Sequence, residues 1–292
     1  MRYSGIFPAL VTPFDEKGKI NGCAIQNLID HLIEQGVSGF YICGSSGESY
    51  LLSMAERKYL IDAVSEAING RVKLIANIGM FATEHGIDLA EYAEKKGADA
   101  ISSVPPFYFH FTMDEYYQYY KDLAESVSIP LLLYNVPALS GVKLTAGDIE
   151  RLINIPGVMG MKHTSYDLFH LQMLIKKYPD KTFFIGHDEL FINALPIGVT
   201  AGIGTSFNFM AEKFITMIKA FNDKDMKLAL KLQNEANEVI DVLCQVGVFN
   251  GTKAILRMQG FDCGVCRKPF QPLSREDMMK VREAAIKNHL LL

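Results

Sequence analysis

Short apolar runs alternate with longer amphipathic segments along the first two thirds of the chain. The runs have the length of buried strands, and we predict strands at 7–14, 39–44, 73–79, 99–104, 130–135, 157–162, 182–186 and 200–204. Between them apolar residues recur at helical spacing, and the first such segment is followed by Gly36, which readily ends a helix. Strands that alternate with helices indicate a parallel sheet, because each helix returns the chain to the same edge.

Several predicted helices begin with a capping pattern. Ser53, Thr112 and Thr145 each stand three residues before a glutamate or aspartate. A hydroxyl and a carboxylate at this spacing can satisfy free amide groups of the first helical turn. Asn69 and Gly70 suit the left-handed end of the helix that begins after Ser53.

Eight strand and helix units predict closure into an α/β fold of the (β/α)8 TIM barrel type. An open doubly wound sheet is the alternative, but the G-x-G-x-x-G turn that usually follows its first strand is absent from the sequence. After Thr205 the pattern is helical only, at about 210–222, 225–246, 251–258 and 275–288. We therefore predict a barrel at 1–222 and a C-terminal helical extension at 223–292, packed together as a single structural unit.

Composition and charge narrow the class of protein. A chain of 292 residues that is 49% hydrophobic has enough apolar material for one large barrel domain. No stretch reaches the roughly 18 uninterrupted apolar residues of a membrane helix, and the early prolines with Asp15 and Glu16 do not suit a signal peptide. The net charge of −4 provides no basic surface for nucleic acid. We expect a cytoplasmic protein without membrane or nucleic-acid partners.

The cysteines and histidines do not form a metal-binding pattern. Cys263 and Cys266 are a single C-x-x-C pair with no second pair and no suitably spaced histidines. The residues His163, His170 and His187 fall on separate predicted elements, without ligand spacing. We therefore expect reduced thiols and no bound metal, and the role of the C-x-x-C pair stays open.

Polar residues cluster where the predicted strands end, which is where barrel enzymes carry their chemistry. Burial removes much of the water from a lysine at a strand end, so the neutral amine becomes available as a nucleophile for a carbonyl. A turn of small residues offers amides and hydroxyls to a carboxylate. The strand ends supply the Gly44–Glu48 turn, Tyr134, Lys162 with Thr164, Gly186 with Asp188 and Glu189, and Thr205.

Each of these features also has a structural interpretation. Lys162 can extend to the surface along its apolar stem, and Tyr134 can be a core tyrosine with a satisfied hydroxyl. Asp188 and Glu189 can cap the helix that follows them. The segment 202–206 is similar to a phosphate-binding turn, which leaves a phosphosugar isomerase as an alternative function.

Four separated motifs together resemble the dihydrodipicolinate synthase/N-acetylneuraminate lyase family over essentially the whole chain. They are Gly44-Ser-Ser-Gly-Glu48, Tyr134-Asn-Val-Pro-Ala-Leu-Ser-Gly-Val-Lys-Leu144, Gly160-Met-Lys-His-Thr-Ser165 and Cys266-Arg-Lys-Pro-Phe270. The resemblance implies a Schiff base on Lys162, proton transfer by Tyr134, and no metal or organic cofactor. By the same resemblance Ser45 and Ser46 hold the carboxylate of pyruvate, and the remaining sugar acid contacts Thr164, Gly186, Asp188, Glu189 and Thr205. Tyr108 matches a tyrosine that approaches the site from an adjacent subunit, and the family is typically a homotetramer.

The implied reaction is the reversible aldol cleavage of N-acetylneuraminate to N-acetylmannosamine and pyruvate, with a keto acid as the small-molecule partner. Dihydrodipicolinate synthases carry an arginine at the position of Leu139, which binds an acidic second substrate, and leucine cannot replace that contact. Ser46, His163 and Thr205 are milder departures from the residues common in the lyases. The alternatives are a 2-keto-3-deoxy sugar acid aldolase or dihydrodipicolinate synthase, and a non-catalytic barrel that binds a sugar acid.

Overall fold

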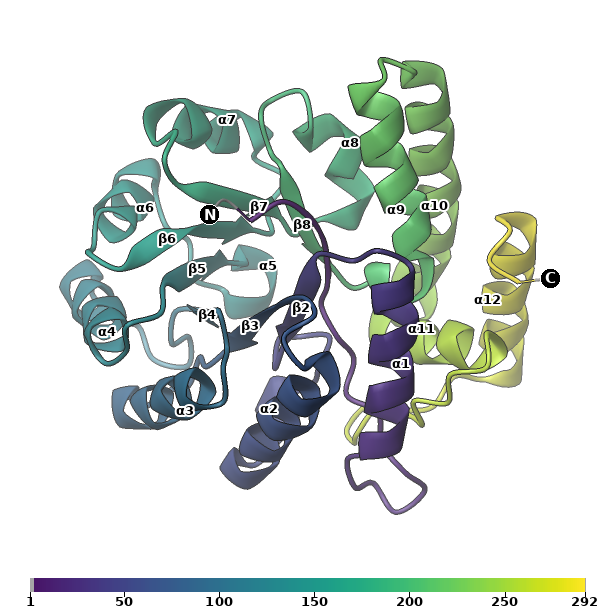
Figure 1. Cartoon of the computed structure of the whole chain (residues 1–292), viewed down its shortest axis with the longest axis horizontal. Coiled ribbons are helices and arrows are strands. Elements are labelled where there is room, and N and C mark those ends of the chain that lie inside the picture. Colours follow the sequence, from purple (N-terminus) through teal and green to yellow (C-terminus); the bar gives the residue numbers. More distant parts are fainter. Residues whose placement is uncertain (1–2, 292) are drawn as a thin grey trace.

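Eight parallel strands form one nearly closed barrel in the computed structural model, which describes residues 3–291 (Figure 1). Neighbouring strands pair in the order β1-β8-β7-β6-β5-β4-β3-β2. The remaining seam between β1 and β2 is bridged by Ala9 and Tyr41, where the Leu10 amide donates to the Tyr41 carbonyl over 2.9 Å. The strands are β1 Gly5–Pro8, β2 Gly39–Ile42, β3 Lys73–Asn77, β4 Ala100–Ser103, β5 Leu131–Asn135, β6 Val158–His163, β7 Thr182–Ile185 and β8 Ala201–Gly204.

The predicted barrel is confirmed, but its first strand is shorter than predicted. The apolar run at 7–14 predicts a strand there, whereas β1 ends at Pro8 and only single bridges follow, at Ala9 and Phe14. Proline has no amide hydrogen to donate, so Pro8 and Pro13 cannot take part fully in a ladder. The segment instead leaves the barrel and runs toward the C-terminal helices, where the Phe14 amide donates to the Cys263 carbonyl.

Three helices around the barrel begin where the sequence places their caps. Ser53, Thr112 and Thr145 each form a complete capping box, and Asn69 has the left-handed conformation expected at a helix end. The helices around the barrel are α1 Gly22–Glu34, α2 Met54–Ile68, α3 Thr83–Lys95, α4 Met113–Glu125, α5 Pro137–Ser140, α6 Ala146–Ile153, α7 Leu168–Lys177, α8 Phe191–Ala194 and α9 Phe207–Asn222, with 3₁₀ turns η1 Ser49–Leu51 and η2 Asp188–Leu190.

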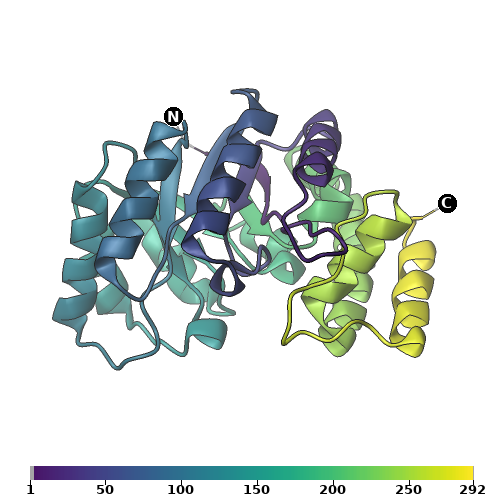
Figure 2. The same cartoon turned by 90° about the horizontal axis from the view of Figure 1, so that it is seen from below.

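Three further helices follow the barrel, as the helical pattern after Thr205 predicts. They are α10 Met226–Val246, α11 Val248–Met258 and α12 Arg275–Lys287. The long helix α10 packs along α9, and Figure 2 shows all three gathered at one side of the barrel. The segment between α11 and α12 runs back toward the mouth of the barrel, where Arg267 reaches the first and second strand–helix units.

The core has two parts, as a filled barrel requires. One lies between the strands and the outer helices. The other lies inside the ring of strands and includes Phe7, Tyr41, Leu132, Tyr134 and Phe184. Inside the barrel the rings of Phe7 and Phe184 meet edge to face, with centroids 5.4 Å apart. The interior of the barrel is therefore packed with side chains.

A bulge in β6 determines which side chains of that strand face the interior. Leu131 of β5 pairs with Val158, but Leu132 pairs with Gly160, so Met159 is an extra residue. Gly160 has a φ of +152°, and a Cβ at this position would lie 1.8 Å from the carbonyl oxygen of Thr182. Only glycine fits this close approach to β7.

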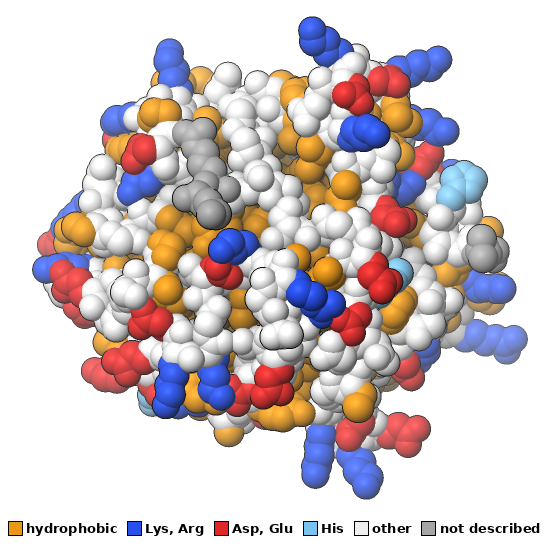
Figure 3. Space-filling view, viewed as in Figure 1, with side chains coloured by type: hydrophobic (Ala, Val, Ile, Leu, Met, Phe, Trp, Pro, Cys, Tyr) orange, Lys and Arg blue, Asp and Glu red, His pale blue; other side chains and the backbone are white. Residues whose placement is uncertain are grey.

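The surface is mixed in character. Lysine, arginine, aspartate and glutamate side chains are interspersed over the face in Figure 3, with apolar side chains between them. Within residues 3–291, no helix has the length and apolar character needed to cross a membrane.

We predict that Gly160→Ala destabilises the fold by roughly 2–5 kcal/mol, because the new methyl group collides with β7 in a backbone conformation that alanine rarely adopts. Urea and thermal unfolding followed by circular dichroism measure this loss. Gly97→Ala is the control. Gly97 has a φ of +86°, but a methyl group there would have no neighbour within 4 Å among residues 3–291, apart from the adjoining residues of the chain. It should cost only about 1 kcal/mol. Equal losses in the two variants would contradict the role given to the close approach.

Candidate active site

The register of β5 against β6 places Tyr134 directly beside Lys162. Both side chains face the barrel interior, and each is 4% exposed. The Lys162 amine lies 4.1 Å from the centroid of the Tyr134 ring and 4.4 Å from that of Tyr41. Lys162 therefore does not extend into solvent, and its amine faces two aromatic rings.

Tyr41 of β2 belongs to this cluster, although sequence reasoning did not select it. Its ring meets that of Tyr134 edge to face, with centroids 6.0 Å apart. Asn77 donates a hydrogen bond of 2.8 Å to the Tyr41 hydroxyl, which in turn donates to Ser102 over 3.2 Å. Complete burial raises the pKa of Tyr41 well above its ordinary value, so it stays a neutral phenol. The sequence did contain a signal for Tyr41, since it lies in a predicted buried strand that leads directly into the Gly44–Glu48 turn.

The Gly44–Glu48 turn lies at the end of β2, and it is held in place from several sides. Ser46 and Thr205 share a hydrogen bond of 2.6 Å, which joins the turn to the end of β8. Thr12 donates to the Gly47 carbonyl over 2.7 Å. The two hydroxyls Ser45 and Ser46 thus belong to a braced turn at the carboxyl ends of the strands, where an anion can be bound by oriented donors.

Thr164 and Gly186 lie next to Lys162 on the other side of the site. A Cβ at Gly186 would lie 1.9 Å from the Thr164 hydroxyl oxygen and 3.1 Å from Cε of Lys162. That hydroxyl is buried, and it has no hydrogen-bond partner among residues 3–291. Since buried hydroxyls normally have a partner, Thr164 is suited to bind a polar group of a ligand.

Asp188 is buried at the start of η2 and connects β7 to the end of β8. Its Oδ2 accepts hydrogen bonds from the Ser206 amide, at 2.8 Å, and from the Ser206 hydroxyl, at 2.6 Å. Burial raises the pKa of Asp188 to about 6.

The interpretation of Asp188 as a helix cap was wrong, because α8 begins at Phe191 without a side-chain cap. The phosphate-turn interpretation also fails, since the Ser206 amide already binds a carboxylate, which would repel a phosphate.

Glu189 lies nearer the surface and forms a small polar cluster. Its carboxylate accepts a hydrogen bond of 3.1 Å from Tyr166, and it lies 2.9 Å from Nδ1 of His187. The rings of Tyr166 and His187 stack with centroids 4.4 Å apart. Glu189 is thereby held at the rim, where it can accept hydrogen bonds from hydroxyl groups of a ligand.

Tyr108 does not join the cluster around Lys162 within this chain. Its side chain is 74% exposed and contacts the rings of Phe81 and Phe109, with centroids 6.3 and 5.0 Å away. The residues predicted for the site from the second, fifth, sixth, seventh and eighth strands meet at one end of the barrel. Tyr108 is the predicted residue that lies outside it.

A cavity of about 290 Å³ opens beside the glycine-rich turn. Its walls are largely apolar and come from both the barrel and the C-terminal helices, with Ser45, Tyr50, Phe107, Leu139, Phe249 and Phe270 among its lining residues. Leu139 is 62% exposed at this mouth. Among residues 3–291, no three or more histidine, cysteine, aspartate or glutamate side chains are grouped so that they could hold a metal ion.

His163 follows Lys162 but faces away from the barrel interior. It is buried beside Asn135, and its Nε2 lies 3.1 Å from the Asp167 carbonyl oxygen. Burial lowers the pKa of His163 to about 4, so the imidazole is neutral at pH 7. A neutral ring that donates from Nε2 to the Asp167 carbonyl satisfies this geometry.

The fold and the site define a class: a (β/α)8 barrel with a buried lysine beside a phenol at the carboxyl ends of its strands. The model of the dihydrodipicolinate synthetase family matches residues 2–288, and the chain belongs to this family. The resemblance seen in the four motifs is thereby confirmed.

Proteins similar to this chain include an N-acetylneuraminate lyase, a sialic acid aldolase and a dihydrodipicolinate synthase. The N-acetylneuraminate lyase of Escherichia coli (strain K12 / DH10B) is 38% identical over 283 residues, which cover 96% of this chain and 95% of the relative. The wild-type sialic acid aldolase of Ruminococcus gnavus has a similar structure, with a TM-score of 0.95 and 31% identity over 99% of this chain and 98% of that one. A dihydrodipicolinate synthase from Bacillus anthracis has a TM-score of 0.93 and 30% identity, covering 97% and 98% of the two chains.

We predict that His163→Gln flattens the dependence of stability on pH below 6.5. The folded protein lowers the pKa of His163 from 6.5 to about 4, so its stabilising contribution is complete above pH 6.5 and is lost as the pH falls toward 4. The loss amounts to roughly 3 kcal/mol. Glutamine can still donate to the Asp167 carbonyl but does not titrate. Thermal unfolding of both proteins from pH 7 to 4.5 measures the difference, and parallel curves would contradict the assignment.

Proposed function

We propose that this protein is a lyase that reversibly cleaves N-acetylneuraminate to N-acetylmannosamine and pyruvate. One observation carries the chemistry: the Lys162 amine lies buried 4.1 Å from the Tyr134 ring, at the strand ends that also carry the hydroxyl-bearing turn. The choice of substrate is supported by relatives named N-acetylneuraminate lyase and sialic acid aldolase, which match nearly the whole chain.

The first step is attack of the neutral Lys162 amine on the C2 carbonyl of the open-chain sugar acid. The carbonyl oxygen leaves as water, and the resulting iminium is an electron sink. The position of the amine supports this role, because it is buried between two aromatic rings at the strand ends, away from bulk water. A solved structure of the Ruminococcus gnavus aldolase is described as a catalytic lysine mutant, which fits a lysine-dependent reaction.

Tyr134 is proposed as the proton carrier. It removes the proton of the C4 hydroxyl, directly or through the substrate carboxylate, and the electrons of the C3–C4 bond move into the iminium. C4 becomes the aldehyde carbon of N-acetylmannosamine, and an enamine remains on Lys162. Protonation at C3 and hydrolysis then release pyruvate and restore the amine. The placement of Tyr134 beside Lys162 on the next strand supports this role.

The remaining polar groups are proposed as substrate contacts. Ser45 and Ser46 would hold the carboxylate at the end of β2, since the turn is braced and its donors converge there. The Thr164 hydroxyl, which has no hydrogen-bond partner among residues 3–291, would receive the polyol part of the sugar together with the backbone at Gly186 and the rim carboxylate of Glu189. Asp188 and Thr205 would complete this side of the site, Asp188 through the carboxylate oxygen that Ser206 does not occupy.

The proposed reaction needs no metal and no organic cofactor, because the iminium on Lys162 itself accepts the electrons of the broken bond. A related aldolase for another keto acid would share Lys162 and Tyr134 and differ at the aldehyde side. There Leu139 presents an apolar side chain at the mouth of the cavity, which cannot pair with an acidic second substrate. This favours the sugar substrate over aspartate semialdehyde.

We also propose that the protein is a homotetramer, a dimer of dimers, with Tyr108 reaching the site of a neighbouring subunit. Two separate groups of exposed apolar side chains support two kinds of interface. One comprises Tyr50, Phe81, Tyr108 and Phe109, and the other comprises Tyr166, Phe169 and Met173 on and before α7.

We further propose that the chain consists of a barrel at 1–222 and an extension at 223–292, which together form one structural unit. The packing of α9 along α10 and the ion pair of Glu48 with Lys253 support this division into closely joined parts. A cytoplasmic location is proposed as well, because the five cysteines are free thiols, which a reducing compartment preserves.

We predict that the purified protein releases pyruvate from N-acetylneuraminate and does not condense pyruvate with aspartate semialdehyde at a comparable rate. The physical reason is the apolar Leu139 where an acidic substrate would need a cation. Coupled assays for pyruvate release and for consumption of the semialdehyde measure both reactions on the same preparation. Faster condensation of aspartate semialdehyde would assign the chain to the synthase reaction instead.

We predict that borohydride in the presence of pyruvate leaves a stable adduct on Lys162, which mass spectrometry of the digested protein locates. Lys162→Ala should lose the adduct and the activity together. Tyr134→Phe should keep the adduct but lose about 10²–10⁴-fold in rate, the usual contribution of a positioned acid–base group. A barrel that only binds sugar acids would give no adduct, and near-normal turnover of Tyr134→Phe would remove the role proposed for the phenol.

A further inference from the structure

A second buried lysine lies behind the glycine-rich turn. Lys253 of α11 is 1% exposed, and its amine donates to Oε1 of Glu48 over 2.7 Å. The Glu48 side chain is fully buried as well. The amine also lies 3.3 Å from the Val265 carbonyl oxygen and 4.4 Å from the centroid of the Phe14 ring. This pair joins the C-terminal extension to the residue that directly follows Gly47.

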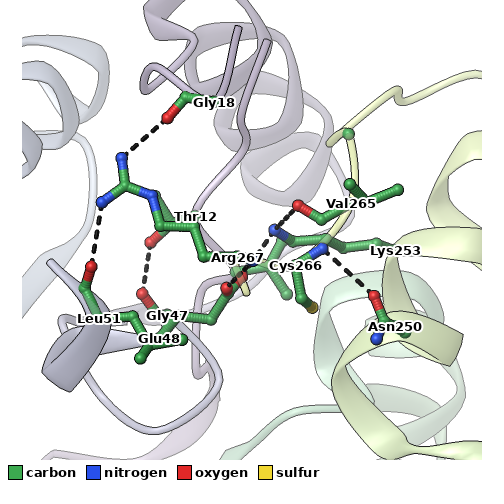
Figure 4. A network of polar contacts seen from close by, with 12 residues as sticks. Thr12, Gly18, Gly47, Glu48, Leu51, Asn250, Lys253, Val265, Cys266 and Arg267 are labelled. Carbon is green, nitrogen blue, oxygen red and sulfur yellow. Dashed lines mark hydrogen bonds and ion pairs between the residues drawn. The ribbon is translucent and has the colours of Figure 1, made fainter. Parts of the chain in front are cut away.

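The other carboxylate oxygen of Glu48 is also held by the extension. This atom, Oε2, accepts a hydrogen bond of 2.7 Å from the Arg267 amide. The guanidinium of Arg267 in turn donates to the carbonyls of Leu51, at 3.0 Å, and Gly18, at 2.8 Å. In Figure 4, Lys253 of α11 reaches Glu48, and Arg267 in the segment that follows α11 reaches the carbonyls of Leu51 and Gly18. Both carboxylate oxygens of Glu48 are therefore fixed by groups of the extension.

The backbone of the turn needs such support. Cys43, which precedes the turn, and Glu48, its last residue, have φ values of 55° and 58°, in the left-handed region that side chains disfavour. Each such residue costs about 1–2 kcal/mol and persists only where its surroundings hold it. The side chain of Glu48 is the anchor that fixes one of these two strained positions, and Ser45 and Ser46 lie between them.

We propose that Lys253 is a positioning residue which, through Glu48, holds the Ser45–Ser46 turn in the shape that binds the substrate carboxylate. This inference rests on the proposed function and names a part of the extension on which the keto acid site depends. Lys253 does not touch the substrate. Its effect reaches the site through the Glu48 backbone, which continues directly into Gly47 and Ser46.

If the Glu48–Lys253 pair only stabilised the fold, its variants would change the stability of the protein and not its affinity for pyruvate. Replacing a buried ion pair by neutral groups of similar size is often neutral or even stabilising, whereas removal of one partner leaves an unpaired buried charge. Stability alone therefore does not test the proposal. Binding of the carboxylate does, because a displaced turn weakens the affinity for pyruvate without changing the chemistry of Lys162 once pyruvate is bound.

The test uses the full chain with Lys253→Met, Glu48→Gln and the two substitutions combined, so that the combined variant buries no charge at this pair. The pyruvate concentration that gives half-maximal borohydride adduct on Lys162 should rise about tenfold, the effect of one misplaced hydrogen bond to a charged group. The adduct at saturating pyruvate should stay complete. In the synthetic direction the KM for pyruvate should rise similarly, and that for N-acetylmannosamine should stay within twofold.

Lys213→Met is the matched control. Lys213 is also a largely buried lysine, paired with Glu235 between α9 and α10, and it lies 3.4 Å from the Asn288 carbonyl oxygen. Its loss should lower the thermal stability and leave the half-saturating pyruvate concentration unchanged. A similar rise in this control would show a general effect of loosened packing and would overturn the proposal.

The outcomes separate this inference from the proposed function. If the wild-type protein forms no adduct with pyruvate, the proposed function fails. If the wild-type protein forms it, and folded variants of the Glu48–Lys253 pair need the same pyruvate concentration within twofold, the positioning role is wrong. Should Lys253→Met or Glu48→Gln fail to fold, the combined variant carries the comparison, since it leaves neither charge of the pair buried without its partner. The pyruvate titration does not depend on which aldehyde the enzyme uses.

Discussion

The chemistry of this barrel depends on a single irregularity in β6. Strict alternation from Val158, which faces the outer core, would turn Lys162 outward as well. The extra residue Met159 shifts the phase, so that Gly160 and Lys162 pair with the inward residues Leu132 and Tyr134. Gly160 makes this possible, because its missing side chain lets β6 pass close to the Thr182 carbonyl. The bulge is thus what brings an amine and a phenol together.

Two buried lysines illustrate how surroundings set the role of one residue type. Lys253 has a carboxylate partner at 2.7 Å, which holds its amine in place between α11 and the turn. Lys162 instead faces the rings of Tyr41 and Tyr134. An amine in that position is held in place yet is free to react with a carbonyl. Both lie at the same end of the barrel, one within the site and one behind the turn that forms its wall.

The C-terminal extension forms part of the wall of the cavity beside the glycine-rich turn. Phe249 and Phe270 line the cavity beside the turn, and Lys253 and Arg267 fix Glu48. The helical pattern after Thr205 predicts these helices, but nothing in that pattern places them at the mouth of the barrel. This wall borders the position of Leu139.

The sequence by itself determined the eight strands, the capping boxes at Ser53, Thr112 and Thr145, and the convergence of polar residues at the strand ends. These depend on local periodicity and on the rule that parallel strands share one carboxyl edge. Tertiary structure alone decided the early end of β1, the inward turn of Lys162 and the part played by Tyr41. It also paired Glu48 with Lys253, 205 residues apart. Strand register and contacts between distant segments arise from packing, which no local pattern encodes.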